Sequence, residues 1–241
     1  MSQNEHIVEA FNQEIEALKT LIMQMGGLTE RILTDAVSAL DGHDMELAAR
    51  TVAAEQRIDA TESEIEEQAI MMLVRRQPLA GDLREIMAAI RIASNLERIG
   101  DLAKNIAKRT AAIGVERQPA QLNRGVGHMA DLALSQLKDV LNAYAVRDVA
   151  KAVAVRDRDG EIDALYNSLF RELLTYMMED PRSITMAAHL LFCAKNIERI
   201  GDHTTNIAET VHYIMTGERL QDDRRKDDSH NYAAVPFPPA A

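Results

Sequence analysis

Four pairs of acidic side chains, each spaced four residues apart, occupy matching places in the two halves of this chain. That spacing puts two side chains one turn apart on the same face of a helix. In each half an Asn follows one turn after the second pair. Carboxylate and amide oxygens gathered in this way are ligands for hard or borderline cations such as Mg²⁺, Mn²⁺, Ca²⁺ or iron. The candidate metal ligands are Glu55, Asp59, Glu97, Asp101 and Asn105 in the first half, and Asp159, Asp163, Glu198, Asp202 and Asn206 in the second.

The second pair of each half belongs to a thirteen-residue motif that occurs twice. Residues 95–107 read NLERIGDLAKNIA and residues 196–208 read NIERIGDHTTNIA, with nine identical positions at an offset of 101. Upstream of the motif the offset is 104, as between Ile58-Asp59-Ala60 and Ile162-Asp163-Ala164. The second copy is therefore three residues shorter near its proline. An internal duplication of this length predicts two similar domains.

Apolar residues at helical spacing predict an all-α fold of two tandem, similar three-helix bundles. Pro78 and Pro181 separate the last two helices of each half. The predicted helices cover about residues 4–40, 45–76 and 79–112, then about 120–145, 148–178 and 181–216. The predicted domains are residues 1–113 and 120–216, joined by a linker at 114–119 and followed by a mobile, proline-containing tail at 217–241.

When the two helices of each pair fold back at the proline, their acidic side chains lie at the same level along the helix axes. Asp59 lies 19 residues before Pro78 and Glu97 lies 19 residues after it; Glu55 and Asp101 lie 23 before and 23 after. The second half keeps this match to within one residue despite its deletion. Because gathered like charges repel one another, a cation is expected among them. The alternative is an ion-pair network in which basic neighbours neutralise the carboxylates, namely Arg98, Lys104, Lys195 and Arg199.

Other reactive residue types give few functional signals. His203 directly follows Asp202 and is a further ligand candidate, although the first half has Leu102 at that place. Glu209 and His212 form half of a di-iron signature, whose chemistry needs two such motifs among four helices. Cys193 is interpreted as a small buried apolar residue. The sequence has no phosphate-binding glycine loop, nucleophile motif or dinucleotide-binding fingerprint, so we predict no catalytic and no cofactor-binding residues.

The composition points to a cytoplasmic protein. Hydrophobic residues make up 46% of the chain, which is ample for a core, and aromatic residues only 4%. A net charge of −11 argues against nucleic acid as a partner, because phosphate binding needs a basic surface. No stretch is long and apolar enough to predict a membrane span or a signal peptide. A single cysteine rules out an internal disulfide and suits a reducing compartment.

The doubled NxERIGDxxxNIA motif, with acidic pairs upstream, resembles the PhoU family of phosphate-specific transport system accessory proteins. The resemblance covers about residues 5–216. It implies two three-helix bundles, a homodimer, and a non-catalytic regulator that acts at the inner membrane through its partners. Those partners are the ATPase subunit of the phosphate ABC transporter and the sensor histidine kinase of the phosphate regulon. The implied outcome is negative regulation of kinase and uptake when phosphate is plentiful.

The resemblance also implies metal ions on the acidic pairs. Relatives hold multinuclear iron or zinc clusters there, and manganese or magnesium suits the same oxygen ligands. All four acidic pairs are intact in this sequence. Two other interpretations of the same residues stay open: a carboxylate-bridged metalloenzyme, and a helical scaffold without metal.

Overall fold

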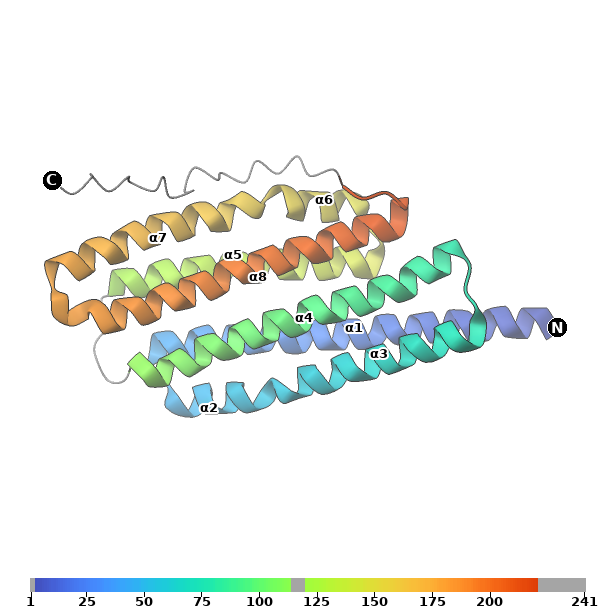
Figure 1. Ribbon diagram of the computed structural model, residues 1–241, viewed down its shortest axis with the longest axis horizontal. Helices are drawn as coiled ribbons and strands as arrows, with labels where there is room; N and C mark the ends of the chain where they lie inside the picture. Colours follow the sequence, from blue (N-terminus) through green and yellow to red (C-terminus); the bar gives the residue numbers. More distant parts are fainter. Residues whose placement is uncertain (1–2, 114–119, 221–241) are drawn as a thin grey trace, which may run out of the picture.

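The computed structural model describes residues 3–113 and 120–220, and all regular secondary structure in these two ranges is helical (Figure 1). The predicted all-α class and the two similar bundles are confirmed. The predicted linker, 114–119, and residues 221–241 of the predicted tail lie outside the described residues. The elements are α1 (Gln3–Gly42), α2 (Met45–Ala54), α3 (Gln56–Arg76), α4 (Ala80–Ile113), α5 (Ala120–Val146), α6 (Val149–Asp157), α7 (Asp159–Glu179), the 3₁₀ turn η1 (Pro181–Ser183) and α8 (Ile184–Thr216).

The second helix of each half is interrupted, which corrects the prediction of continuous helices over 45–76 and 148–178. At the first interruption the N–H of Ile58 donates to the carbonyl of Glu55 at 2.8 Å, three residues back rather than four. At the second, the N–H of Glu161 donates to the carbonyl of Arg158 at 3.1 Å. Such a 3₁₀ turn tightens a helix locally. The apolar spacing continues through both turns, so it could not reveal them.

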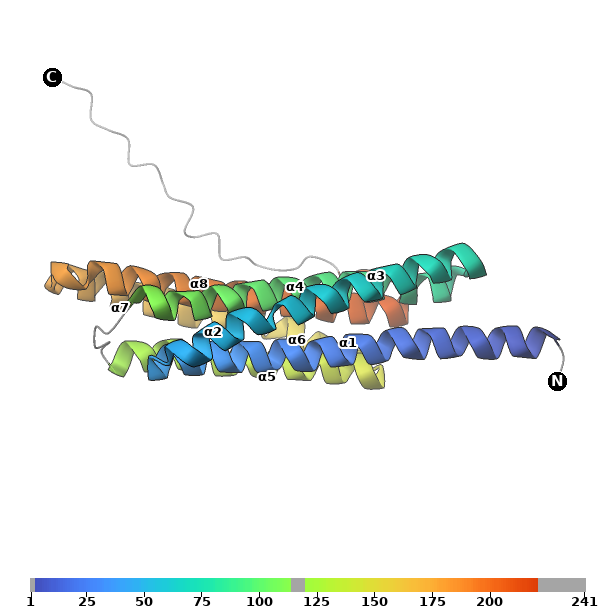
Figure 2. The same cartoon turned by 90° about the horizontal axis from the view of Figure 1, so that it is seen from below.

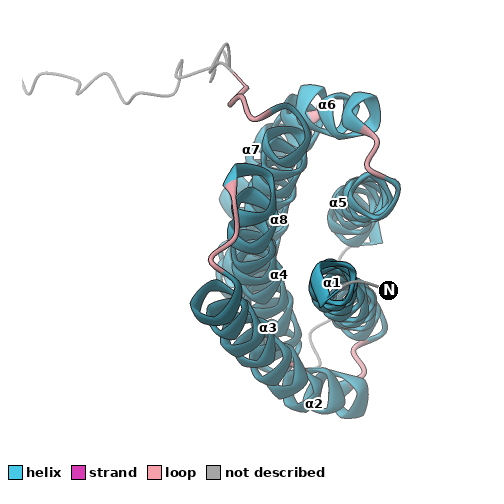
Figure 3. Ribbon diagram, turned by 90° about the vertical axis from the view of Figure 1, so that its right-hand side faces the viewer, coloured by secondary structure: helices cyan, strands magenta, loops and turns pink. Residues whose placement is uncertain are grey.

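The helices form a curved layer with α1 and α5 on its concave side (Figure 3). Along the layer, α2 and α3 are followed by α4, then α8, then α7 and α6. Seen from below, α1 and α5 lie beneath this layer (Figure 2). The two halves meet where α4 packs along α8 and α1 packs against α5. Their buried side chains form one continuous hydrophobic core across this seam. In the described residues, no helix combines the length and apolar character needed to cross a membrane.

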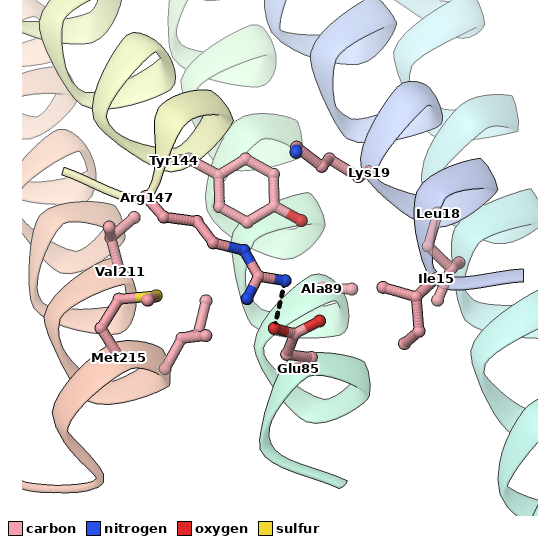
Figure 4. Close-up of a pocket in the computed structure, with 10 residues that line it drawn as sticks. Ile15, Leu18, Lys19, Glu85, Ala89, Tyr144, Arg147, Val211 and Met215 are labelled. Carbon is pink, nitrogen blue, oxygen red and sulfur yellow. Dashed lines mark ion pairs between the residues drawn. The ribbon is translucent and has the colours of Figure 1, made fainter. Parts of the chain in front are cut away.

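A small cavity lies in the seam between the halves (Figure 4). Its walls include Ile15 of α1, Met215 of α8 and the ring of Tyr144, and an ion pair between Glu85 and Arg147 lies beside them. The cavity holds about 30 Å³, which is room for a single water molecule. This space is too small for a substrate, so the cavity is a packing feature of the seam.

The close approach of the last two helices in each half depends on the glycine of the repeated motif. A Cβ atom on Gly100 would stand 2.6 Å from Cδ1 of Ile58, and one on Gly201 would stand 2.8 Å from Cδ1 of Ile162. Each isoleucine lies between the two members of an acidic pair on the facing helix. The glycine therefore sets the distance between the two helices that carry the carboxylates.

Replacing Gly100 by Val should lower the free energy of unfolding by about 1–3 kcal/mol, because the branched side chain must push Ile58 and α3 away from α4. Gly27, which is exposed on α1 and has no atom within 4 Å of its Cβ position, supplies the control. Gly27→Ala should raise the free energy of unfolding by about 0.5–1 kcal/mol. Urea unfolding followed by circular dichroism measures both values. Similar effects of the two substitutions would contradict the assigned role of Gly100.

Candidate functional site

The acidic side chains of the first half meet where α2 and α3 pack against α4. Oxygens of Glu55, Asp59 and Glu97 all lie within 4.8 Å of one another. Glu55, at the tight turn between α2 and α3, is only 3% exposed, whereas Asp59 is exposed. We call these three residues together with Asp101 the first cluster. Three converging carboxylates of this kind could hold a metal ion.

Lys104 lies inside the first cluster and joins two of its members. Its Nζ is 2.8 Å from Oε1 of Glu55 and 2.8 Å from Oδ1 of Asp101. Burial lowers the pKa of Lys104, but the hydrogen bonds to Asp101 and Glu55 outweigh it and raise this pKa above its ordinary value. Asn105 donates from Nδ2 to Oδ2 of Asp101 at 3.3 Å. The structure therefore contains part of the ion-pair alternative, through a lysine side chain that is 19% exposed.

Burial and charge repulsion both act on Glu97 of the first cluster. Burial raises the pKa of Glu97; Arg98 opposes this, and the three other carboxylates of the cluster add to it. Arg98 Nε stands 3.4 Å from Oε2 of Glu97. Glu62, one turn after Asp59, also has a raised pKa, from burial first and Glu97 second. Glu62 is not among the ligands predicted from the sequence, where its only signal is its position three residues after Asp59.

The acidic side chains of the second half, Asp159, Asp163, Glu198 and Asp202, form the second cluster. Burial, followed by repulsion from Glu198, Asp159 and Asp202, raises the pKa of Asp163 to about 6. Thr205 donates from Oγ1 to Oδ1 of Asp159 at 2.8 Å. Lys195 Nζ is 2.6 Å from Oε1 of Glu198, whose Oε2 is buried and has no hydrogen-bond partner among the described residues. An orphaned carboxylate oxygen beside three like charges fits a cation. Unlike the first cluster, this one does not bring three described carboxylates within 4.8 Å of one another.

Two polar side chains near the second cluster face the seam between the halves instead. Asn206 donates from Nδ2 to Oδ1 of Asn95 on α4 at 3.5 Å, and Nδ1 of His203 lies 3.0 Å from the same oxygen. Asn206 is predicted from the sequence to be a ligand in the second cluster, because it lies one turn after Asp202. That spacing does not reveal that α8 packs along α4 here and supplies Asn206 with another partner.

The remaining candidates lie apart from both clusters. His212 Nδ1 is 3.1 Å from the carbonyl oxygen of Glu218, near the end of α8. Cys193 is fully buried, and burial raises the pKa of its thiol to about 12. This agrees with its interpretation as a small apolar core residue.

Two helical bundles of the same plan, each with acidic pairs facing across its last two helices, define the class of protein. The family model for the PhoU domain matches the chain twice, over residues 22–110 and 126–211. These two matches cover most of the chain and one falls in each half. The chain therefore belongs to the PhoU family.

Similar proteins and solved structures match most of the chain. A protein of Rhizobium meliloti (strain 1021), 56% identical over 92% of this chain and 94% of its own, is named phosphate-specific transport system accessory protein PhoU homolog. The crystal structure of PhoU from Pseudomonas aeruginosa has a TM-score of 0.83 and 37% identity, covering 86% of this chain and 100% of its own. The phosphate transport system regulatory protein PhoU from Streptococcus pneumoniae has a TM-score of 0.81 and 28% identity, covering 88% of this chain and 99% of its own.

Replacing Asp163 by Asn should make the metal-free protein more stable at neutral pH. The folded-state pKa of about 6 lies above the ordinary value of 3.8, so the folded protein resists ionisation of this group. Its contribution to stability therefore falls as the pH rises from about 4 to about 6, and the loss is complete at higher pH. Asp163 is partly buried among the other acidic groups but also contacts solvent, and this solvent reduces the size of the effect.

Thermal unfolding in a chelator at several pH values measures this effect. The midpoint of Asp163→Asn should exceed that of the unsubstituted protein at pH 7.5, and the difference should shrink as the pH falls towards 4. A difference that does not depend on pH, or a variant that is less stable at pH 7.5, would contradict the assigned repulsion.

Proposed function

We propose that this protein is a non-catalytic regulator of phosphate uptake. In this proposal it links the ATPase subunit of a phosphate ABC transporter to the sensor histidine kinase of the phosphate regulon, and restrains both when phosphate is plentiful. The observation that carries the proposal is the similarity of nearly the whole chain to an accessory protein of a phosphate-specific transport system. The proposed place of action is the cytoplasm, at the inner membrane through the partners.

An adaptor needs surfaces that bind other proteins, and each half offers one at the turn of its long hairpin. The turns between α3 and α4 and between α7 and α8 lie at opposite ends of the molecule (Figure 1). Exposed apolar side chains occur there at equivalent positions of the repeat. We call these sets the first and second tips; their matching pairs are Ile70 and Leu174, Val74 and Met178, and Leu83 and Ile184.

The exposure of these side chains supports their assignment to partner binding. Val74 is 70% exposed and Met178 is 83% exposed, although both are strongly apolar. Contiguous exposed apolar patches usually mark interaction sites. Because the duplication gives both tips the same chemistry, we assign both to one kind of partner, the transporter ATPase. Regulation then requires that the protein bind one state of this partner more tightly than another.

We also propose that the two clusters bind divalent metal ions, namely iron, zinc, manganese or magnesium. The all-oxygen donor set and the orphaned oxygen of Glu198 support this assignment. A bound ion would neutralise the gathered charge and tie the interrupted helix of each half to the helix that follows it. A metal-free scaffold is the second candidate, and Lys104 favours it in the first half, because its ammonium already stands between two carboxylates there.

Deletion of the gene in its own host tests the proposed regulation. Genes of the phosphate regulon should be expressed in phosphate-rich medium in the deletion strain, and the intact gene should restore their repression. Reporter activity of a phosphate-starvation promoter measures this directly. Normal repression in the deletion strain would overturn the proposal.

The double variant Val74→Asp/Met178→Asp should fail to restore repression and should not bind the purified ATPase subunit, because each charge would be buried in the proposed interface. Met45→Asp is a control, since Met45 is 48% exposed and begins α2, a helix that carries no residue of either tip. Both proteins should keep their helical circular dichroism. Restoration of repression by the double variant as complete as by the control would contradict the role of the tips.

A further inference from the structure

A polar groove lies on the seam between the halves, where α4 and α8 run side by side (Figure 1). Its volume is about 580 Å³, which is the size of a small-molecule site rather than of a single ion or water molecule. Both helices and the residues that follow α8 contribute to its walls. The polar side chains that matter here are Arg91, Ser94, Asn206, Thr210, Tyr213 and Arg219.

Several of these side chains are hydrogen-bond donors that lack an acceptor. Within residues 3–113 and 120–220, the guanidinium groups of Arg91 and Arg219 have no ion pair and no hydrogen bond. The hydroxyl groups of Ser94 and Tyr213 have no hydrogen bond to these residues either. Asn206 donates from its amide to an asparagine oxygen on α4 at 3.5 Å, and its second amide hydrogen remains available. The groove therefore offers several donors to a bound acceptor.

The charge of the groove is positive, although the whole chain carries −11. Two guanidinium groups and one carboxylate, that of Glu209, belong to its lining. Arg84 adds a third guanidinium at the end of α8, where its Cζ lies 3.5 Å from the position of a Cβ atom on Gly217. The buried Nε of Arg84 has no hydrogen-bond partner in the described part of the chain. Planar guanidinium groups match the oxygens of a phosphate and bind them in pairs.

The related place at the other end of the seam holds a stacked pair of side chains instead. In the repeat, Phe192 corresponds to Arg91 and Arg109 corresponds to Thr210. The guanidinium carbon of Arg109 lies 4.6 Å from the centre of the Phe192 ring, so these two side chains contact each other across the seam. An arginine and a small threonine take their places at the groove. The groove is thus a property of the side chains at this end, and not of the packing that both ends share.

We propose that this groove binds a small molecule that carries a phosphate group, with Arg91 and Arg219 contacting the phosphate oxygens. Donors that lack acceptors favour an anion that only accepts hydrogen bonds. The volume exceeds that of a phosphate ion and leaves room for an attached nucleoside, to which the ring of Tyr213 offers an apolar face. The groove shares no carboxylate with either cluster and no residue with either tip, so the inference is independent of the proposed function.

Isothermal titration calorimetry of the full chain tests the inference, with inorganic phosphate, ATP and adenosine as probes. EDTA and a constant ionic strength exclude binding through a metal ion at the clusters. One molecule of a phosphate-bearing probe should bind per chain, and adenosine should not. Binding of inorganic phosphate as tight as that of ATP would support the free anion as ligand, whereas binding of ATP alone would support a nucleotide. Absence of binding by both phosphate probes, or equal binding of adenosine and ATP, would overturn the inference.

Substitutions at the groove show where the probe binds. Arg91→Gln should weaken binding about tenfold or more, because a charge-assisted hydrogen bond is lost. Arg91→Phe copies the other end of the seam and should abolish binding, since an aromatic ring would replace the guanidinium. Arg171→Gln removes the same charge from an exposed position on α7, which does not line the groove, and should leave the titration unchanged.

Circular dichroism should show that all three variants are folded. Equal weakening by Arg91→Gln and Arg171→Gln would mean that the probe responds only to overall charge, and would overturn the inference. Unchanged binding by folded Arg91→Gln and Arg91→Phe proteins would also overturn it.

Discussion

Repulsion between carboxylates is the constraint on which the rest of this structure depends. In each half, four acidic side chains lie at the same level along two antiparallel helices. A glycine at this level lets the two helices pack closely. Gly100 and Gly201 allow this approach, because a side chain there would meet Ile58 or Ile162. The second helix of each half tightens into a 3₁₀ turn at the same level. The fold thus concentrates negative charge where its backbone is least regular, and departures from local regularity of this kind are typical of functional sites.

The two halves resolve this repulsion differently, although they descend from one repeat. In the first half the partly buried ammonium of Lys104 bonds the facing carboxylates of Glu55 and Asp101. In the second half the pKa of Asp163 stays raised, and an oxygen of Glu198 has no hydrogen-bond partner among the described residues. The helices that carry the clusters, α3, α4, α7 and α8, also carry the exposed apolar tips at opposite ends of the molecule. In the proposed function, a change of charge at a cluster therefore acts on the same rigid helices that contact the partners.

The helices, the hairpins and the matching levels of the acidic residues can be predicted from the sequence. They depend on the spacing of apolar residues and on the prolines at which the chain reverses direction. Pro78 and Pro181 mark where the hairpins turn, and equal distances from a turn bring Glu55 level with Asp101. What could not be predicted depends on side-chain direction and on the contact between the halves. Lys104 and Asn206 were both within the motif, yet their partners depend on which face of α4 or α8 is covered. The helix interruptions at Glu55 and Arg158 leave the spacing of apolar residues unchanged, so the sequence does not predict them. The single core across the seam depends on contacts between the two halves, which the spacing of residues within one helix does not predict.

Elemental analysis of the protein purified from its own host, without an affinity tag or a chelator, tests the metal account most directly. We expect at least one equivalent of a transition metal or magnesium per chain, held by the acidic clusters through oxygen ligands. The metal should be lost in the double variant Asp101→Ala/Asp202→Ala. Protein that contains no metal, together with a double variant that unfolds at the same temperature as the unsubstituted chain, would contradict this account. The two clusters would then be acidic surfaces neutralised by their own lysines and arginines.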